Sequence, residues 1–341
     1  MSSQAPGQHI SARPGQEVTA DGCTGRASHG GRARRTVEGM DNRAEVREFL
    51  TTRRAKISPE QAGLPAGGQR RVPGLRRSEV AALAGMSVEY YAKLERGALA
   101  GVSPGVLDAI ARTLRLDDAE RAHLFDLARA ANTSPARLRR RPARKTEVPA
   151  TVQRALDAIT GGPAHVRNGR MDMLAANTLG WALYSEVLAA PERPANFARF
   201  AFLDRERAER FYPDWDVAAD IAVDILRTEA GRDPYDKGMQ DLVGELSTRS
   251  DVFRTKWGAH NVRIHSTGTK TFHHPVVGDL HLAYDGMDLV SNSGLSMWIY
   301  TAEPGSPSED GLRLLASWAT TQNLEAAVAR DVPSISEPQN N

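Results

Sequence analysis

The chain has 341 residues, of which 40% are hydrophobic and 25% charged, and its formal net charge is +2. This length favours two domains, and the composition is typical of a soluble globular chain with a sizeable core. Membrane, secreted and disulfide-stabilised classes are excluded. No run approaches the ~18–20 apolar residues of a membrane span, the N-terminus lacks the apolar segment of a signal peptide, and Cys23 is the single cysteine. We therefore expect a cytoplasmic protein without a membrane partner.

Residues 1–40 contain seven glycines, five arginines and no periodic apolar pattern. Such a segment buries too little surface to offset its ordering entropy, so we predict a disordered N-terminal extension over 1–40. Met40 directly precedes the first patterned stretch, and we expect translation to begin there. The alternative is a flexible arm that touches a phosphate backbone through Arg32, Arg34 and Arg35.

The small net charge is the sum of two opposite charges along the chain. Residues 41–147 hold 21 Lys and Arg against 13 Asp and Glu, a net of +8, whereas residues 148–341 hold 18 against 26, a net of −8. A basic, proline-containing run separates the two halves. We therefore predict a basic domain over 41–133, a basic linker over 134–147, an acidic domain over 148–322 and a disordered tail over 323–341.

Helix signals dominate the basic domain. Val46, Phe49 and Leu50 form one apolar stripe, and Ser103-Pro104 places a capping residue before a proline at the first helical position. Asp117 and the residue that follows it open a further helix. These signals predict an all-α domain of five short helices over 41–133.

Residues 77–97 have the pattern of a helix-turn-helix. Ala81 is small where two helices must cross, Gly85 tolerates the positive φ of the turn, Ser87 can cap the second helix, and Gly97 can end it. The apolar positions that this motif buries are Val80, Ala84, Met86, Tyr91 and Leu94. The alternative is an ordinary helical hairpin with a solvated charged face, which would not account for the four coincident constraints or the +8 charge.

The second helix of this motif is expected to read the major groove of a double-stranded DNA operator. Lys93 can donate to guanine acceptors and Glu89 can accept from a cytosine amine, while Arg76 and Arg77, with Arg70 and Arg71 before them, suit phosphate contacts. The predicted DNA-binding residues are Arg76, Arg77, Ser87, Val88, Glu89, Tyr90, Lys93 and Arg96. Glu95 lies nearer the core, so we expect it to form a structural ion pair with an arginine.

The acidic domain has a mixed pattern. An Asn-Gly turn predicts a β-hairpin over 164–174. Helices are predicted over 178–188, 196–202, 205–211, 216–228 and 236–246, strands over 261–265, 270–274, 279–284, 287–290 and 295–300, and a last helix from Ser306. The expected fold is an α/β domain in which helices flank a curved antiparallel sheet, and such a sheet can enclose a small cavity.

Both halves resemble one known family. The runs 70–81 and 90–97 resemble the lambda-repressor-like, or XRE-family, helix-turn-helix, in the branch that carries an MmyB-like ligand-binding domain. The second half is similar to that domain at 174–177, 196–200, 244–246, 257–262, 274–278 and 302–308. The resemblance implies a PAS-like fold, a fatty-acid-like effector and a role in transcription regulation. The polar run 167–170 departs from the apolar surroundings expected of such a pocket.

Four residues are candidate ligand contacts. Arg199 lies in an apolar helix and, if it turns inward, can hold a carboxylate with two hydrogen bonds. His260 and His274 can hydrogen-bond within the fold or to a ligand head group, and Asn177 suits a helix N-cap better than a ligand.

Five histidines fall between 260 and 281, and they leave open a second interpretation, an enzyme with a histidine-dependent metal site. No H-E-x-x-H spacing supports it, and the adjacent His273 and His274 would point to opposite faces of a strand. We therefore expect no catalytic residue, metal or cofactor. The predicted protein is a homodimeric regulator that binds operator DNA and a small amphiphilic ligand.

Overall fold

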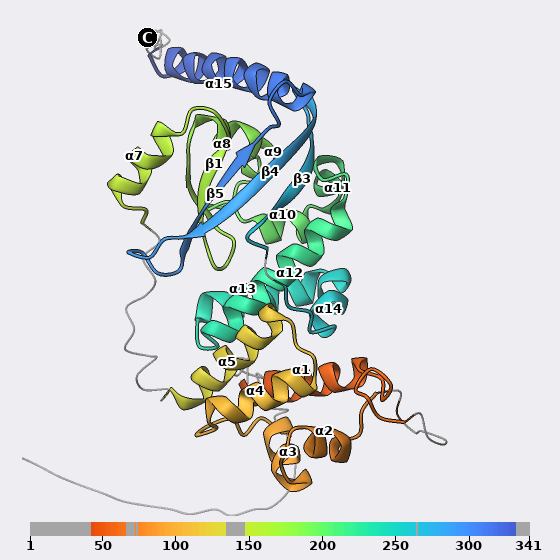
Figure 1. The fold of residues 1–341 in the computed structure, drawn as a ribbon. Helices are drawn as coiled ribbons and strands as arrows, with labels where there is room; N and C mark the ends of the chain where they lie inside the picture. Colours follow the sequence, from red (N-terminus) through yellow and green to blue (C-terminus); the bar gives the residue numbers. More distant parts are fainter. Residues whose placement is uncertain (1–41, 66–71, 73, 134–146, 264, 332–341) are drawn as a thin grey trace, which may run out of the picture. The chain divides into compact units, whose positions relative to one another are not determined.

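The computed structural model describes residues 42–65, 72, 74–133, 147–263 and 265–331, with side chains up to residue 322 (Figure 1). The extension predicted over 1–40, the arginines expected to touch phosphates at positions 70 and 71, and nearly all of the predicted linker lie outside these residues.

The basic half is helical throughout its regular structure. Its helices are α1 (Asn42–Lys56), α2 (Arg77–Leu83), α3 (Val88–Glu95), α4 (Pro104–Thr113) and α5 (Asp118–Asn132). Their apolar faces share one core, which includes Phe49, Val80, Tyr91 and Leu94. The predicted helical domain is therefore present.

The turn between α2 and α3 has the predicted local geometry. Gly85 has a φ of +69°, a left-handed conformation that side chains rarely adopt. The Ser87 hydroxyl accepts a hydrogen bond from the backbone N–H of Tyr90 at 3.1 Å and so caps α3. Ala81 is fully buried where α2 packs, and Met86 packs against the same core while remaining half-buried. The predicted helix-turn-helix is confirmed.

The acidic half contains a five-stranded antiparallel sheet in the order β2-β1-β5-β4-β3. Its strands are β1 (Ala164–Asn168), β2 (Met173–Ala176), β3 (Thr267–His274), β4 (Gly278–Asp288) and β5 (Leu295–Thr301). The predicted hairpin is the β1–β2 pair. Because β5 pairs with β1, the two ends of the domain's sequence meet in the middle of the sheet.

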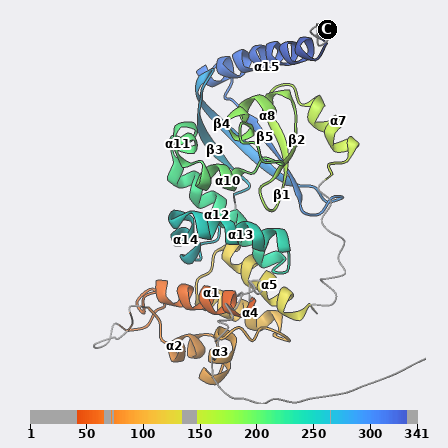
Figure 2. The ribbon, with the colours of Figure 1, turned by 180° about the vertical axis from the view of Figure 1, so that it is seen from behind.

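Helices cover both faces of this sheet. Side chains alternate between the two faces along each strand, so both faces carry apolar side chains to bury. On one face Val166 and Met297 pack with Leu156 of α7 (Ala150–Ala158). Figures 1 and 2 show α7 beside the sheet on the side away from α11 and α12. The other face packs on a larger core. The helices of this half after α7 are α8 (Thr178–Leu183), α9 (Ser185–Leu188), α10 (Phe197–Leu203), α11 (Arg205–Phe211), α12 (Trp215–Arg232), α13 (Lys237–Arg249), α14 (Asp251–Gly258) and α15 (Pro307–Asp331).

Several predicted elements differ from those observed. The expected strand over 261–265 is not a strand in its described residues, because Val262 instead buries its side chain in the core of the helical half. The expected strand over 287–290 is wrong, since β4 continues without a break through Asp288. Tyr184 divides the helix expected over 178–188 into α8 and α9, and α14 was not predicted. α15 continues to Asp331, so residues 323–331 of the predicted tail are helical.

No helix in the described part of the chain combines the length and the apolar character that crossing a membrane requires.

Candidate functional site

The outward face of α3 carries the side chains predicted to contact DNA. Val88, Glu89, Tyr90, Lys93 and Arg96 are all exposed at or near this helix. On the same helix Tyr91 and Leu94 are fully buried, so α3 is held to the domain by one face and presents the other. A short capped helix with an exposed polar and basic face is the form in which a helix-turn-helix enters the major groove.

The arginines at the start of α2 have different environments. Arg76 is exposed, and its backbone N–H donates to the Glu79 carboxylate at 2.6 Å. The Arg77 guanidinium donates to Glu95, although about half of the Arg77 side chain remains exposed. Ser87 is likewise exposed, but its hydroxyl oxygen already caps α3.

Glu95 forms the predicted structural ion pair. Its side chain is 1% exposed and accepts from Arg54 of α1 at 2.7 Å, as well as from Arg77 of α2. Arg54 also donates to the backbone carbonyl of Leu75 at 2.8 Å. One carboxylate therefore ties the second helix of the motif to the two helices that precede it.

The histidines of the acidic half are engaged separately. The nearest polar partners of His265, His273 and His281 are Asp224 at 3.1 Å, Asp279 at 2.6 Å and Thr271 at 3.1 Å, respectively. Among the residues that the structure describes, no three His, Cys, Asp or Glu side chains gather in a way that suits a metal ion.

The four predicted ligand contacts do not line the cavity described below. Asn177 caps α8 by accepting from Gly180 N–H at 2.7 Å. Arg199 pairs with Glu245 at 2.8 Å and is about one-third exposed. His274 lies 3.1 Å from the Ala182 carbonyl oxygen, and His260 lies 2.9 Å from Glu48 of α1.

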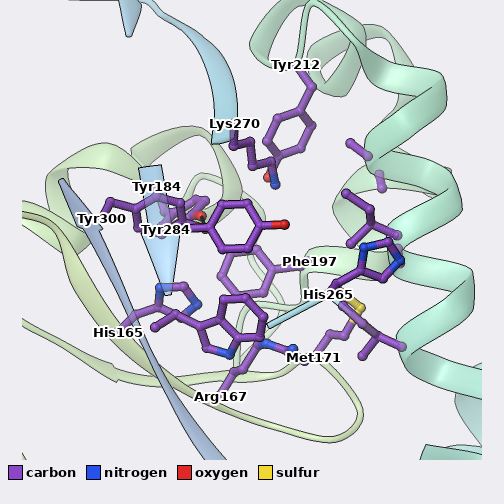
Figure 3. Close-up of a pocket in the computed structure, with 16 residues that line it drawn as sticks. His165, Arg167, Met171, Tyr184, Phe197, Tyr212, His265, Lys270, Tyr284 and Tyr300 are labelled. Carbon is purple, nitrogen blue, oxygen red and sulfur yellow. Dashed lines mark hydrogen bonds between the residues drawn. The ribbon is translucent and has the colours of Figure 1, made fainter. Parts of the chain in front are cut away.

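A cavity of about 60 Å³ lies between the inner face of the sheet and α12. Most of its wall is aromatic or aliphatic, and its basic side chains come from the strands and from the segment before β3. The strands contribute His165 and Arg167 of β1, Lys270 of β3, Tyr284 of β4, and Trp298 and Tyr300 of β5. The opposite wall includes Ala218, Ile221, Ala222 and Ile225 of α12, and Tyr184, Tyr212 and His265 also line the cavity. Figure 3 shows Lys270 and Arg167 at opposite ends of a group of aromatic rings.

Arg167 and Lys270 are the unusual members of this wall. The Arg167 guanidinium is 4.6 Å from the centre of the Trp298 ring, and the Lys270 amine is 4.1 Å from that of Tyr212. Within the described part of the chain, neither side chain forms an ion pair with a carboxylate. Burial, with the nearby charge of Arg167, lowers the pKa of Lys270 to about 7. Two basic side chains therefore face an aromatic cavity without a direct ion pair, although the charges of Glu229 and Asp288 act on Arg167 from a distance.

The tyrosines of the cavity and His165 are neutral. The Tyr184 hydroxyl donates to the Tyr300 hydroxyl at 2.7 Å, and burial raises the pKa of Tyr184 well above its ordinary value and that of Tyr300 to about 12. Burial, with the charges of Arg167 and Lys270, holds the pKa of His165 well below its ordinary value. The ring nitrogen Nδ1 of His165 is buried without a hydrogen-bond partner among the described residues. The cavity thus holds a buried polar atom whose hydrogen-bonding capacity the described residues do not satisfy.

A second cavity, of about 460 Å³, adjoins the first. The two share Arg167, Ile225, His265 and Trp298 as lining residues. Arg167 therefore stands where the small, largely apolar inner cavity meets the larger outer one.

Neither Arg167 nor Lys270 was predicted as a ligand contact. The signal for Arg167 was present, because strand alternation places it on the same face as His165, and the polar run 167–170 already stood out. The signal for Lys270 was its position two residues before the buried Phe272 in β3, which places both side chains on the same face of the sheet.

Two comparisons with protein families agree with this geometry. Residues 148–315, which include the sheet and the cavity, match the family described as MmyB-like transcription regulator ligand binding domain. Residues 32–124, which include α2 and α3, match a helix-turn-helix domain. A search of curated proteins finds no match to the chain.

Proposed function

Because the chain is a helix-turn-helix transcription regulator with an MmyB-like ligand-binding domain, we propose that its inner cavity binds an anionic amphiphile such as a fatty acid. The observation that carries this proposal is the pair Arg167 and Lys270, which face an aromatic cavity without a carboxylate partner. A carboxylate head group would supply the missing anion, and the apolar wall would hold the alkyl chain.

The DNA contacts that we propose come from α3 and the start of α2. Lys93 and Glu89 would meet base edges, with Val88, Tyr90 and Arg96 beside them. Arg76 and Arg77 would contact phosphates, as would Ser87 at the N-terminus of α3. The protein would act in the cytoplasm as a homodimer on a palindromic operator, with half-sites about 34–36 Å apart.

The ligand class is tested by calorimetry of the full-length protein with dodecanoate and with dodecanol. The two probes share a chain and differ in the charge of the head group, so the proposal expects dodecanoate to bind at least tenfold more tightly. Equal affinities would contradict an anionic ligand. Native mass spectrometry of the freshly purified protein would identify any lipid that accompanies it.

The affinity for dodecanoate is expected to fall as pH rises above about 7. Lys270 has a pKa of about 7 in the free protein, partly because of the charge of Arg167, and a carboxylate bound at Arg167 would offset that charge and raise the pKa of Lys270. Below pH 7 the amine is charged before and after binding, so affinity is at its maximum. Above pH 7 binding must take up a proton, and affinity falls by up to about tenfold per pH unit. Calorimetry in buffers of different ionisation enthalpy measures this proton uptake.

Lys270→Met is the control for this pH dependence. The variant removes the amine while keeping an unbranched chain, so its weaker dodecanoate binding should no longer change between pH 7 and 9. A dependence that persists in the variant would come from another group and would contradict the assignment to Lys270.

Replacing Lys93 with alanine is expected to cost about 1–3 kcal/mol of operator binding while leaving binding to unrelated DNA unchanged. The exposed position of Lys93 on α3 suits contact with a base edge rather than the backbone. The measurement is a titration of the full-length protein with DNA selected in vitro by the wild type, and with a scrambled duplex. An equal loss on both duplexes would make Lys93 a phosphate contact.

A further inference from the structure

Helix α12 has two opposite functional faces: one lines the inner cavity, and the other packs against the helix-turn-helix half. Ala218, Ala222 and Ile225 lie on the face that lines the inner cavity. At about 100° per residue, Arg227 lies on the opposite side of the helix from this stripe. That side packs against α5 of the helix-turn-helix half, and both halves fall within one compact unit, Gly39–Asn341.

Arg227 connects the ligand-binding domain to α1 through a buried network. Its side chain is 1% exposed, and it donates to the Glu45 carboxylate of α1 and to the backbone carbonyl of Trp257. Its Nη1 also lies 2.9 Å from His260 Nδ1. Burial would raise the pKa of Glu45, but the nearby side chains of His123, at 3.7 Å, and His260, at 3.5 Å, together with the charge of Arg227, outweigh it and hold the pKa well below its ordinary value. The network is therefore a true ion pair.

The segment that follows α14 forms a second connection. The carbonyl oxygen of His260 accepts from Arg53 of α1, and Val262 packs in the helix-turn-helix core. Three residues further on, His265 lines the inner cavity and lies 3.1 Å from Asp224 of α12. One short stretch of chain thus reaches from the core of the DNA-binding half to the cavity.

None of these contacts involves the exposed face of α3. They are made by α1 and α5, while Val88 and Lys93 remain exposed. The inner cavity, at about 60 Å³, has room for only a few water molecules, so an amphiphile that enters it must displace part of its wall or extend into the outer cavity, and α12 lines both. Helix α12 is part of that wall, and through Arg227 it also contacts Glu45 of α1.

We infer that α12, together with the segment 257–265, transmits occupancy of the cavity to α1 and so reorients the recognition helix without covering it. This inference rests on the ligand-dependent regulation proposed above. In this mechanism the ligand binds more tightly to the arrangement in which α12 has moved away from the sheet, and this differential affinity shifts the equilibrium between the two arrangements. In a dimer, a small rotation of each recognition helix changes the match to both half-sites.

Gly231 offers a variant that disturbs this junction without removing a charge. A Cβ atom at Gly231 of α12 would lie 2.5 Å from the buried His123 ring of α5, so alanine there must displace that ring or the helix that carries it. Gly244 of α13 is the matched control, since a Cβ atom there meets no other atom within 4 Å. Alanine favours helix over glycine at both positions, so both variants should fold.

The test is amide hydrogen exchange of the full-length protein, with and without dodecanoate. In the wild type and in Gly244→Ala, dodecanoate should change exchange in both α12 and α1. In Gly231→Ala the change should be confined to α12. An unchanged response of α1 in Gly231→Ala would overturn the inference, as would a wild-type protein in which dodecanoate affects α12 and leaves α1 unaffected.

The ligand-free samples allow the inference about α12 to be judged separately from the proposed ligand. If dodecanoate affects no segment of the wild type, the ligand proposal fails, whereas the junction is still judged by comparing the two variants alone. Gly231→Ala should then accelerate exchange in α1 by about tenfold relative to Gly244→Ala, and equal rates would overturn the inference. Glu45→Gln, which removes the charge on the α1 side, should reproduce the effect if Gly231→Ala does not fold.

Discussion

Replacing Arg167 with methionine is expected to weaken dodecanoate binding by about 100-fold, equivalent to about 2.7 kcal/mol. Arg167 is 7% exposed and stands where the inner and outer cavities meet, so a carboxylate bound there forms charge-assisted hydrogen bonds away from bulk water. Methionine retains an unbranched side chain against Trp298, so the loss should reflect the guanidinium rather than the packing. Calorimetry of the full-length variant measures the change.

Arg199→Met separates this assignment from the one that the sequence predicted. Arg199 is partly exposed and pairs with Glu245, and it does not line either cavity. Its replacement should therefore leave dodecanoate affinity within about twofold of the wild type. A large loss in Arg199→Met, with little effect of Arg167→Met, would reverse the assignment and return the head group to α10.

Replacing Glu95 with glutamine is expected to destabilise the helix-turn-helix half by about 2–4 kcal/mol. The carboxylate is buried between Arg54, whose side chain is 12% exposed, and Arg77. An amide of the same shape leaves these guanidinium groups without their anion, and a buried cation that has lost its partner is costly. Chemical denaturation of the full-length protein, followed by hydrogen exchange in α1 and α3, measures the effect in this half.

Glu89→Gln is the matched control, because it makes the same substitution on the exposed face of the same helix. Its stability should stay within about 0.5 kcal/mol of the wild type. If the two variants had equal stability, the ion pairs of Glu95 would contribute nothing to holding α3 in place.

The helix-turn-helix was predictable because its requirements are local. Ala81, Gly85 and Ser87 lie within seven consecutive residues, and each acts through backbone geometry that a residue type specifies by itself. The buried ion pair of Glu95 was predictable for the same reason, because its position on the helix places it at the edge of the core. The charge of each half, +8 and −8, also follows from the sequence and predicts a boundary between them.

The ligand cavity and the junction were decided by the tertiary structure. Arg167 and Lys270 come from β1 and β3, which share no edge and are brought to one cavity only by the sheet order. Whether Arg199 and His260 turn toward that cavity depends on how whole helices pack. Arg199 instead pairs with Glu245, and His260 lies beside Glu48. Periodicity reveals which side of an element is buried, but the element that covers that side is selected by contacts distant in sequence. Val262 illustrates this, because its apolar character predicted a strand and its actual neighbours are the helices of the other domain.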